Sequence, residues 1–313
     1  MQKVLILDGK FKEKIWGGDR LKKEFNYDIN SNSIGEYWAI SAMKDAPSTI
    51  INGDLTGKTL DEVYKDYKGL FANPTEETFP LLVKIIDAKK DLSIQVHPDD
   101  DMAEKLENSR GKTECWYILN DDQSSIIYGL NVDNKNQAID FINNKKRDEV
   151  LREVPARKGD FFFVPAGTVH AIKEGCLILE IQQASDVTYR LYDYDRPDKN
   201  GNLRELHIEK SLEAIRINKT EEKAIVENIG NMIKTTLTSN EFFEVREIKI
   251  KGKQSMIRNK DYLLESVIDG AGELIIDGEK FNIKKGDFFI LTNEVSSYEF
   301  DGDLTIVESN VVR

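Results

Sequence analysis

Short apolar runs, separated by Gly, Pro, Asn and Asp, recur along most of the chain. Runs of this length with period-two alternation are typical of β-strands that are joined by turns. The pattern predicts strands at residues 3–7, 37–41, 81–87, 92–96, 115–119, 161–164 and 177–182. Many short strands with turn signals between them predict a mainly β protein with a sandwich or barrel architecture.

Helical periodicity is confined to a few brief segments. The clearest helix start is the sequence from Thr59 to Glu62, which has the form of a capping box. Asp99 or Asp100 could cap a second helix, because apolar residues follow at helical spacing. Further short helices are predicted at residues 137–143, at residues 148–151 and from residue 208 onward.

A weak internal repeat links two distant parts of the chain. Residues 154–164 and 281–291 both contain a Lys-Gly-Asp turn followed by an aromatic strand. The repeat predicts two copies of one double-sheet β unit. We place them in a domain of residues 1–225 with helical insertions and a smaller domain of residues 226–313. No histidine occurs after His207, so we expect the second domain to lack metal ligands.

Composition narrows the class of protein. A chain of 313 residues is long enough for about two domains. A net charge of −12 argues against a protein that wraps nucleic acid or lies on an anionic membrane, so an anionic substrate would need a local cationic pocket. No apolar run suggests a signal peptide or a membrane span, and we predict a cytoplasmic protein. The two cysteines, Cys115 and Cys176, are expected to be buried and unpaired.

The chain has three histidines, and two of them lie in a pattern typical of a metal site. His97 and His170 each stand at a predicted strand end, and Glu114 stands at the start of a third strand. Two imidazoles, one carboxylate and one neutral oxygen, with room for water or substrate, form the arrangement expected of a catalytic zinc. The alternative is that both histidines are ordinary hydrogen-bonded residues. The zinc signatures H-E-x-x-H and paired C-x-x-C are absent.

Strand alternation indicates which neighbours share the face of these candidate ligands. Gln95 lies two residues before His97, and Lys112 lies two residues before Glu114. Side chains two apart on a strand point to the same side, so Gln95 and Lys112 are expected to face the same cavity as the candidate ligands. Lys112 could attract a substrate anion there, or it could pair with Glu114.

Several motifs together resemble one enzyme family, the short bacterial type I mannose-6-phosphate isomerases of the cupin superfamily. The order and spacing of these motifs agree over about the first 215 residues, and the last third is less diagnostic. The matching segments are residues 15–18, 35–38, 79–87, 93–100, 111–116, 165–170 and 180–190. The resemblance implies two cupin-type jelly-roll β-sandwich domains with one zinc ion per chain inside the first.

The resemblance also implies roles for individual residues. It implies a metal-dependent isomerase that interconverts mannose 6-phosphate and fructose 6-phosphate through an enediol, with a small phosphosugar as its partner. The metal ligands would be Gln95, His97, Glu114 and His170, the active-site arginine would be Arg190, and the polar pocket residues would be Lys112, Glu180 and Asp186.

The isomerase chemistry needs a base and a cation. Glu180 and Asp186 are the carboxylate candidates for the base, beside an ordered metal-bound water, and Arg190 or Lys112 could stabilise the developing enediolate. Lys84 and Arg196 are further cations that could hold a phosphate group. Two rival functions stay open: a non-haem iron oxygenase, because two histidines and a carboxylate also form its facial triad, and a sugar-binding cupin without turnover.

Overall fold

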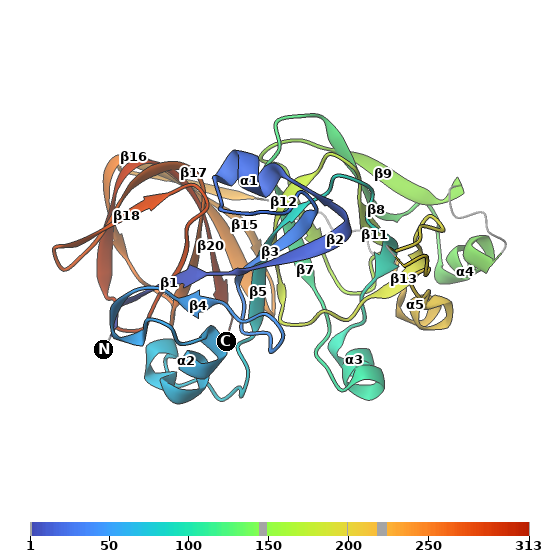
Figure 1. Ribbon diagram of the computed structural model, residues 1–313, viewed down its shortest axis with the longest axis horizontal. Coiled ribbons are helices and arrows are strands. Elements are labelled where there is room, and N and C mark those ends of the chain that lie inside the picture. The colour runs from blue at the N-terminus through green and yellow to red at the C-terminus, as the bar shows by residue number, and fades with distance from the viewer. Residues whose placement is uncertain (1, 144–148, 199, 218–223, 313) are drawn as a thin grey trace. The chain divides into compact units, whose positions relative to one another are not determined.

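The computed structural model describes residues 2–143, 149–198, 200–217 and 224–312 (Figure 1). The chain divides into two compact units. We call residues 11–37 and 84–221 the central unit, and residues 1–10, 38–83 and 222–313 the C-terminal unit. The domain boundary near residue 225 stays a prediction. Within the described residues, no helix is long and apolar enough to cross a membrane.

Two antiparallel sheets form the frame of the central unit. One has six strands in the order β10-β7-β12-β5-β3-β2, and the other has five in the order β13-β6-β11-β8-β9. Between them lies a shared apolar core, to which Trp116 and Ile118 contribute from the first sheet and Ile126 and Ile172 from the second. The strands are β2 (Lys10–Gly18), β3 (Ile34–Ile40), β5 (Leu81–Asp87), β6 (Ile94–Val96), β7 (Glu114–Ile118), β8 (Ser124–Leu130), β9 (Leu151–Ala156), β10 (Phe161–Val164), β11 (His170–Ile172), β12 (Leu177–Gln183) and β13 (Tyr189–Tyr192).

Short helices cover the outer face of the five-stranded sheet. They are α3 (Asp100–Glu107), α4 (Lys135–Asn143) and α5 (Ile208–Ala214), and α1 (Arg20–Phe25) follows β2. Met102, Ala138 and Ala214, one from each covering helix, share a core with the sheet. The predicted N-cap of α3 is confirmed, because the Asp99 carboxylate accepts the Met102 N–H at 3.0 Å. The helix predicted at residues 148–151 is confirmed only in part where it is described: Glu149 has 3-10 helical geometry, Val150 lies in a turn and Leu151 begins β9. Residue 148 lies outside the described residues.

The C-terminal unit is built on a nine-stranded antiparallel sheet that wraps around its own apolar core (Figure 1). Its strands are β1 (Val4–Asp8), β4 (Thr49–Ile50), β14 (Ile225–Ile229), β15 (Met232–Ser239), β16 (Phe243–Ile257), β17 (Leu263–Ile276), β18 (Glu279–Lys284), β19 (Phe288–Leu291) and β20 (Ser297–Val311). Its helices are η1 (Gly53–Leu55), α2 (Leu60–Asp66) and η2 (Lys68–Phe71). The capping box is confirmed at α2, where the Thr59 N–H donates to the Glu62 carboxylate at 2.9 Å.

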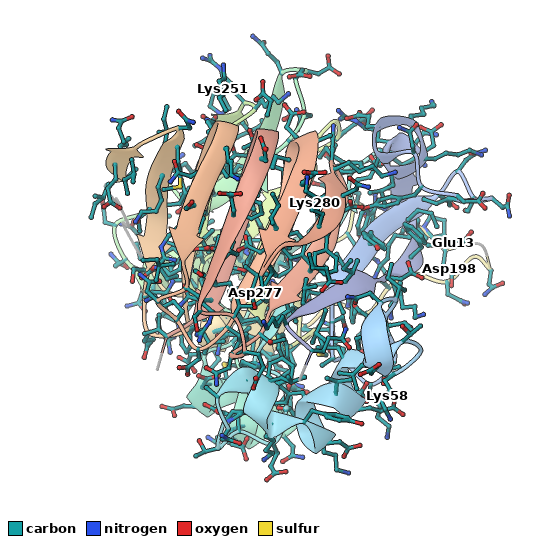
Figure 2. All side chains as sticks on the ribbon, turned by 90° about the vertical axis from the view of Figure 1, so that its left-hand side faces the viewer. Glu13, Lys58, Asp198, Lys251, Asp277 and Lys280 are labelled. Carbon is teal, nitrogen blue, oxygen red and sulfur yellow. The ribbon has the colours of Figure 1, made fainter. Side chains whose placement is uncertain are left out.

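Glycines allow the three longest strands of this unit to approach closely. Gly252, Gly302 and Gly272 lie opposite one another on β16, β20 and β17. A Cβ atom at Gly272 would lie 2.5 Å from the Asp301 carbonyl oxygen, so a larger residue would not fit without a shift. The outer side of the sheet is charged, as the exposed side chains of Lys251 and Lys280 illustrate (Figure 2).

The predicted repeat has the same local geometry in both units. Before β10, the Arg157 N–H donates to the Asp160 carboxylate at 2.8 Å, and before β19 the Lys284 N–H donates to the Asp287 carboxylate at 2.8 Å. The glycine that precedes each aspartate has a positive φ, 86° in the first turn and 95° in the second, which residues with a Cβ rarely adopt. The repeated turn is therefore present in both units. The strands and helices described above also confirm the predicted fold class, mainly β with a few short helices.

Candidate metal centre

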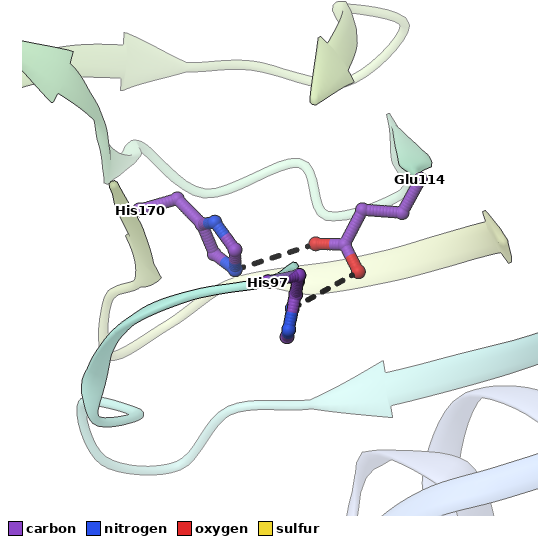
Figure 3. Close-up of side chains that lie close together, drawn as sticks. All are labelled: His97, Glu114 and His170. Carbon is purple, nitrogen blue, oxygen red and sulfur yellow. Dashed lines mark ion pairs between the residues drawn. The ribbon is translucent and has the colours of Figure 1, made fainter. Parts of the chain in front are cut away.

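His97, Glu114 and His170 form a compact buried group inside the central unit (Figure 3). They come from the end of β6, the start of β7 and the start of β11, so three strands on two sheets place them. Each histidine Nε2 lies 3.4 Å from a different Glu114 carboxylate oxygen. The side chains are only 1% exposed, and their potential ligand atoms lie within 4.8 Å of one another. This is a donor set of two imidazole nitrogens and one carboxylate.

Backbone carbonyls orient both imidazole rings. The Nδ1 of His97 lies 2.8 Å from the Val187 carbonyl oxygen, and the Nδ1 of His170 lies 2.9 Å from that of Thr168. A carbonyl only accepts, so each Nδ1 carries the proton and each Nε2 presents a lone pair to the group. Burial and the nearby Lys112 lower the pKa of His97 to about 3, and burial lowers the pKa of His170. Both rings are therefore neutral at neutral pH, as metal ligation requires.

Glu114 supplies the negative charge of the group. Burial favours its neutral form, but the Lys112 ammonium group outweighs burial and holds the pKa of Glu114 well below its usual range. Among the described residues, neither carboxylate oxygen accepts a hydrogen bond of good geometry, although both are buried. Buried oxygens without such partners are costly unless a cation completes the site, so these residues fit a divalent metal.

Gln95 lies beside the group as predicted. It faces His170 across the β6–β11 pair, and its Nε2 lies 3.2 Å from His170 Nε2. Its Oε1 is 3.1 Å from the Ser93 hydroxyl, which donates to it. A hydroxyl can also accept, so turning the amide over would keep this bond and direct the oxygen toward the metal ligands. Gln95 can thus supply the neutral oxygen.

Lys112 places its ammonium group against the same carboxylate. Its Nζ lies 2.8 Å from Glu114 Oε2 and 3.1 Å from His97 Nε2. The side chain is only 5% exposed, as expected if it faces the same cavity as Glu114. The predicted pairing with Glu114 is therefore present, and it places the lysine where an anion near the metal ligands would be attracted.

Glu180 belongs to a second layer of buried charge next to Lys112. Its Oε1 is 2.9 Å from Lys84 Nζ and 3.9 Å from Lys112 Nζ, and its Oε2 accepts the Trp116 indole N–H at 2.9 Å. Burial and the Glu114 carboxylate raise the pKa of Glu180 despite the two lysines. Lys84 also lies 3.8 Å from Glu36 Oε1. A lysine partner for Glu180 was one interpretation of the sequence, but Lys84 was considered only as a phosphate ligand and not as that partner.

Arg190 faces the same interior from the five-stranded sheet. It lies opposite Gln95 on β6, which in turn lies opposite His170 on β11. Residues directly opposite on antiparallel strands share a face, so the three form one row. His207 fixes the backbone of this strand: its Nδ1 accepts the Arg190 N–H at 3.2 Å, and its own N–H donates to the Arg190 carbonyl at 2.8 Å. That support was not foreseen, because it depends on which segments pair.

The remaining candidates lie outside the buried group. Asp186 is exposed in the loop between β12 and β13. Arg196 pairs with Asp193, its Nη2 lying 2.8 Å from Asp193 Oδ1. Cys115 and Cys176 are both buried, as predicted, and form no disulfide bond.

Comparison with known proteins identifies the family. Residues 4–131 match the type I phosphomannose isomerase catalytic domain, and residues 232–311 match the mannose-6-phosphate isomerase cupin domain. The chain is 44% identical to the mannose-6-phosphate isomerase of Streptococcus mutans serotype c over 312 residues, which are 99% of each chain. The chain belongs to the type I phosphomannose isomerases. This membership bears out the family and the cupin fold that the sequence motifs implied.

Solved structures support the same fold. The mannose 6-phosphate isomerase of Bacillus subtilis superposes with a TM-score of 0.96 at 40% identity, covering 99% of this chain and 100% of that one. A zinc-bound mannose 6-phosphate isomerase, only 14% identical, gives a TM-score of 0.76 over 100% of both chains, and that likeness concerns the fold alone. Together with the buried His97, Glu114 and His170, the family supports a divalent metal site in the central unit.

Proposed function

We propose that this phosphomannose isomerase family member interconverts mannose 6-phosphate and fructose 6-phosphate. The observation that carries the proposal is the buried group of His97, Glu114 and His170 with two cationic side chains, Lys112 and Arg190, directed at the same interior. Aldose–ketose isomerisation moves a proton between C1 and C2, and negative charge develops on O1 and O2. An interior that combines a metal with fixed cations is suited to that charge.

We assign one zinc ion per chain to this group. His97, Glu114 and His170 would hold it, with Gln95 as the neutral fourth ligand. Nitrogen and oxygen donors in this number suit zinc, and three charged or imidazole ligands plus an exchangeable position are usual for catalytic sites. When bound, the metal would supply Lewis-acid polarisation of the sugar oxygens.

Glu180 is the base of the proposed reaction. It takes the proton from C2 of the open-chain aldose, the C–H electron pair forms the C1–C2 double bond, and O1 takes up the negative charge. The hydroxyl proton then moves from O2 to O1, so that the negative charge passes to O2. Glu180 returns its proton to C1 as the C2 carbonyl forms. Burial and the Glu114 carboxylate raise the pKa of Glu180, and an upward shift makes a carboxylate a better proton acceptor. The exposed Asp186 lacks this burial.

Lys112 and Arg190 have a different part. Neither is assigned the proton transfer; each can stabilise the enediolate oxygens as charge develops. Arg190 Nε is buried and has no hydrogen-bond partner among the described residues, so the guanidinium keeps a donor available for an oxygen anion.

The test is turnover of mannose 6-phosphate by the purified protein before chelation, after chelation and after zinc is restored. We expect activity to disappear and return. An iron oxygenase would instead need iron and oxygen, and a sugar-binding protein would show no turnover with metal fully loaded. E180Q should keep its metal and lose turnover, whereas D186N should lose much less. The reverse order would assign the proton transfer to Asp186.

A further inference from the structure

The shared Lys-Gly-Asp turn fixes which residues of the two units are equivalent. In the central unit the Gly159 N–H donates to the Ile118 carbonyl at 2.9 Å, and in the C-terminal unit the Gly286 N–H donates to the Val267 carbonyl at 2.8 Å. Ile118 of β7 therefore corresponds to Val267 of β17. Counting two residues back along each strand makes Glu265 the equivalent of Trp116.

The equivalence extends to the neighbouring strand. Trp116 lies opposite Glu180 on β12, and Glu265 lies opposite Glu308 on β20. The buried carboxylate Glu180 thus has a counterpart, Glu308, which is itself only 4% exposed. A cation from the next strand completes the copy: Lys84 pairs with Glu180, and Arg246 of β16 pairs with Glu308.

The two copies differ in what donates a hydrogen bond to the buried carboxylate. In the central unit the Trp116 indole N–H donates to Glu180 at 2.9 Å. The equivalent position in the C-terminal unit holds Glu265, which is 0% exposed. Neither Glu265 oxygen has a hydrogen-bond partner among the described residues. An ionised carboxylate only accepts, so two ionised carboxylates side by side would repel each other, and neither could donate a hydrogen bond to the other.

The other charged groups around Glu265 do not remove this conflict. On β16, Arg246 pairs with both Glu308 and Glu244. On β20, the Tyr298 hydroxyl lies 3.5 Å from Glu308 Oε2, and in the β16–β17 connection Lys260 Nζ lies 3.4 Å from Glu244 Oε2. On β19, the residue opposite Glu265 is an apolar phenylalanine. Three carboxyl groups therefore share two cations, and neither cation forms an ion pair with Glu265.

We propose that Glu265 is a neutral carboxylic acid at neutral pH and donates its proton to Glu308, so that the folded C-terminal unit holds one buried proton. The O–H of Glu265 takes the place of the indole N–H of Trp116 in the central unit. Burial and the Glu308 carboxylate raise the pKa of Glu265 well above its ordinary value. The indole does not titrate, so the hydrogen-bond donor at this position is sensitive to pH only in the C-terminal copy.

The direction of the pH effect follows from linkage. The pKa of Glu265 is higher in the folded than in the unfolded chain, so the stabilisation is fully present at acidic pH and is lost as pH rises through the folded value. Between the unfolded and the folded pKa of Glu265, one bound proton changes the equilibrium between the folded and the locally unfolded C-terminal unit by up to about tenfold per pH unit. Gln at this position keeps a donor for Glu308 but cannot ionise, so E265Q should not show the change.

Amide hydrogen exchange of the full-length, metal-loaded protein tests this. We would compare wild type, E265Q and the control E279Q, which removes an exposed carboxylate of β18, between about pH 5 and about pH 8. In peptides from β17 and β20, corrected for intrinsic rates, protection of wild type and E279Q should fall several-fold relative to E265Q as pH rises. A ratio that does not change with pH overturns the proposal.

Infrared spectroscopy of the wild-type protein keeps the proposal testable if E265Q does not fold. A buried protonated carboxyl gives a carbonyl stretch that is separate from those of carboxylates. We expect this band at neutral pH, and we expect E308Q to weaken it, because Glu265 can then ionise beside Arg246. No protonated carboxyl band in wild type at neutral pH would overturn the proposal.

Discussion

The interiors of the central and C-terminal units carry the same buried ion pair in two different settings. Glu180 with Lys84 in one corresponds to Glu308 with Arg246 in the other. The metal-ligand positions, in contrast, have diverged. Glu114 corresponds to Leu263, because both lie four residues before the equivalent pair that the shared turn defines.

The counterparts of His170 and Gln95 are found from the first residue pair of β11 and of β20, the strands that follow β10 and β19. His170 begins β11 opposite Gln95, and Ser297 begins β20 opposite Ile257. His97 lies two residues after Gln95, so its counterpart is Asn259. No position of the ligand set in the C-terminal unit holds a histidine or a carboxylate. That the second domain lacks metal ligands stays a prediction.

The buried ion pair is present in both units, whereas the proposed metal ligands are present only in the central unit. The formation of the ion pair therefore does not depend on a metal. A buried pair is costly to break from one side, because the remaining charge has no partner. The pair is therefore part of the frame of both units, and in the central unit its carboxylate also lies within reach of Lys112.

The largest effect should come from removing a proposed ligand in the central unit and, as a control, its counterpart in the C-terminal unit. H97A and H170A should lose bound metal and more than about 100-fold in activity, since even residues behind metal ligands cost 10–100-fold. The matched controls N259A and S297A alter the equivalent C-terminal positions and should keep both. Metal content by mass spectrometry and turnover would be measured together. A histidine variant that kept metal and activity would disprove the site.

Arg190 should have the next largest effect. It extends the row of Gln95 and His170, whereas Ile257 and Ser297, their counterparts, have no third residue beside them on the described strand β15, which pairs with β16 only as far as Ile250. R190A should retain metal and lose about 10²–10³-fold in kcat, the usual range for one donor to a developing anion. R152A, which changes an exposed arginine of β9, is the control. A loss of only a few-fold in R190A would make this arginine peripheral.

Breaking the two ion pairs should separate stability from catalysis. K84M and R246M each leave a buried carboxylate without its cation, and each should lower the free energy of unfolding by about 3–5 kcal/mol. Only K84M should also lower kcat per folded molecule, because its partner Glu180 is the proposed base. Urea unfolding and turnover normalised to folded protein would show this. Equal losses of kcat in both variants would contradict the division of roles.

The ligand group could be predicted because its information is local. Strand alternation around His97 and Glu114 and the strand start at His170 limited how these side chains could point, and family motifs supplied the rest. The capping box at Thr59 and the turn at Asp160 were also visible, since each is specified within a few residues.

Features that depend on strand neighbours were not predictable in this way. The Lys84–Glu180 pair exists because β5 lies beside β12, and no local spacing reports that order. The helix expected at residues 148–151 ends earlier than predicted, because a short apolar pair fits both helical and strand periods, and Leu151 pairs with Leu130 on β8 as part of a strand. The 15-residue strands β16 and β20 were missed because charges and glycines interrupt their apolar pattern.

The smallest expected effect concerns a carboxyl group that is buried in the central unit and replaced in the C-terminal one. Asp87 is 1% exposed, and its carboxylate accepts the Arg20 N–H at 2.8 Å, whereas the equivalent Lys249 is exposed. Burial raises the pKa of Asp87 from 3.8 to about 6. The stabilisation present in acid is therefore lost as pH rises through about 6, by about 2–3 kcal/mol at 1.36 kcal/mol per unit.

D87N keeps an acceptor for Arg20 but cannot ionise, so amide exchange in α1 should lose this pH dependence, while K249Q should behave as wild type. Equal pH dependence in D87N and wild type would mean that Asp87 is already ionised in the folded protein at acidic pH.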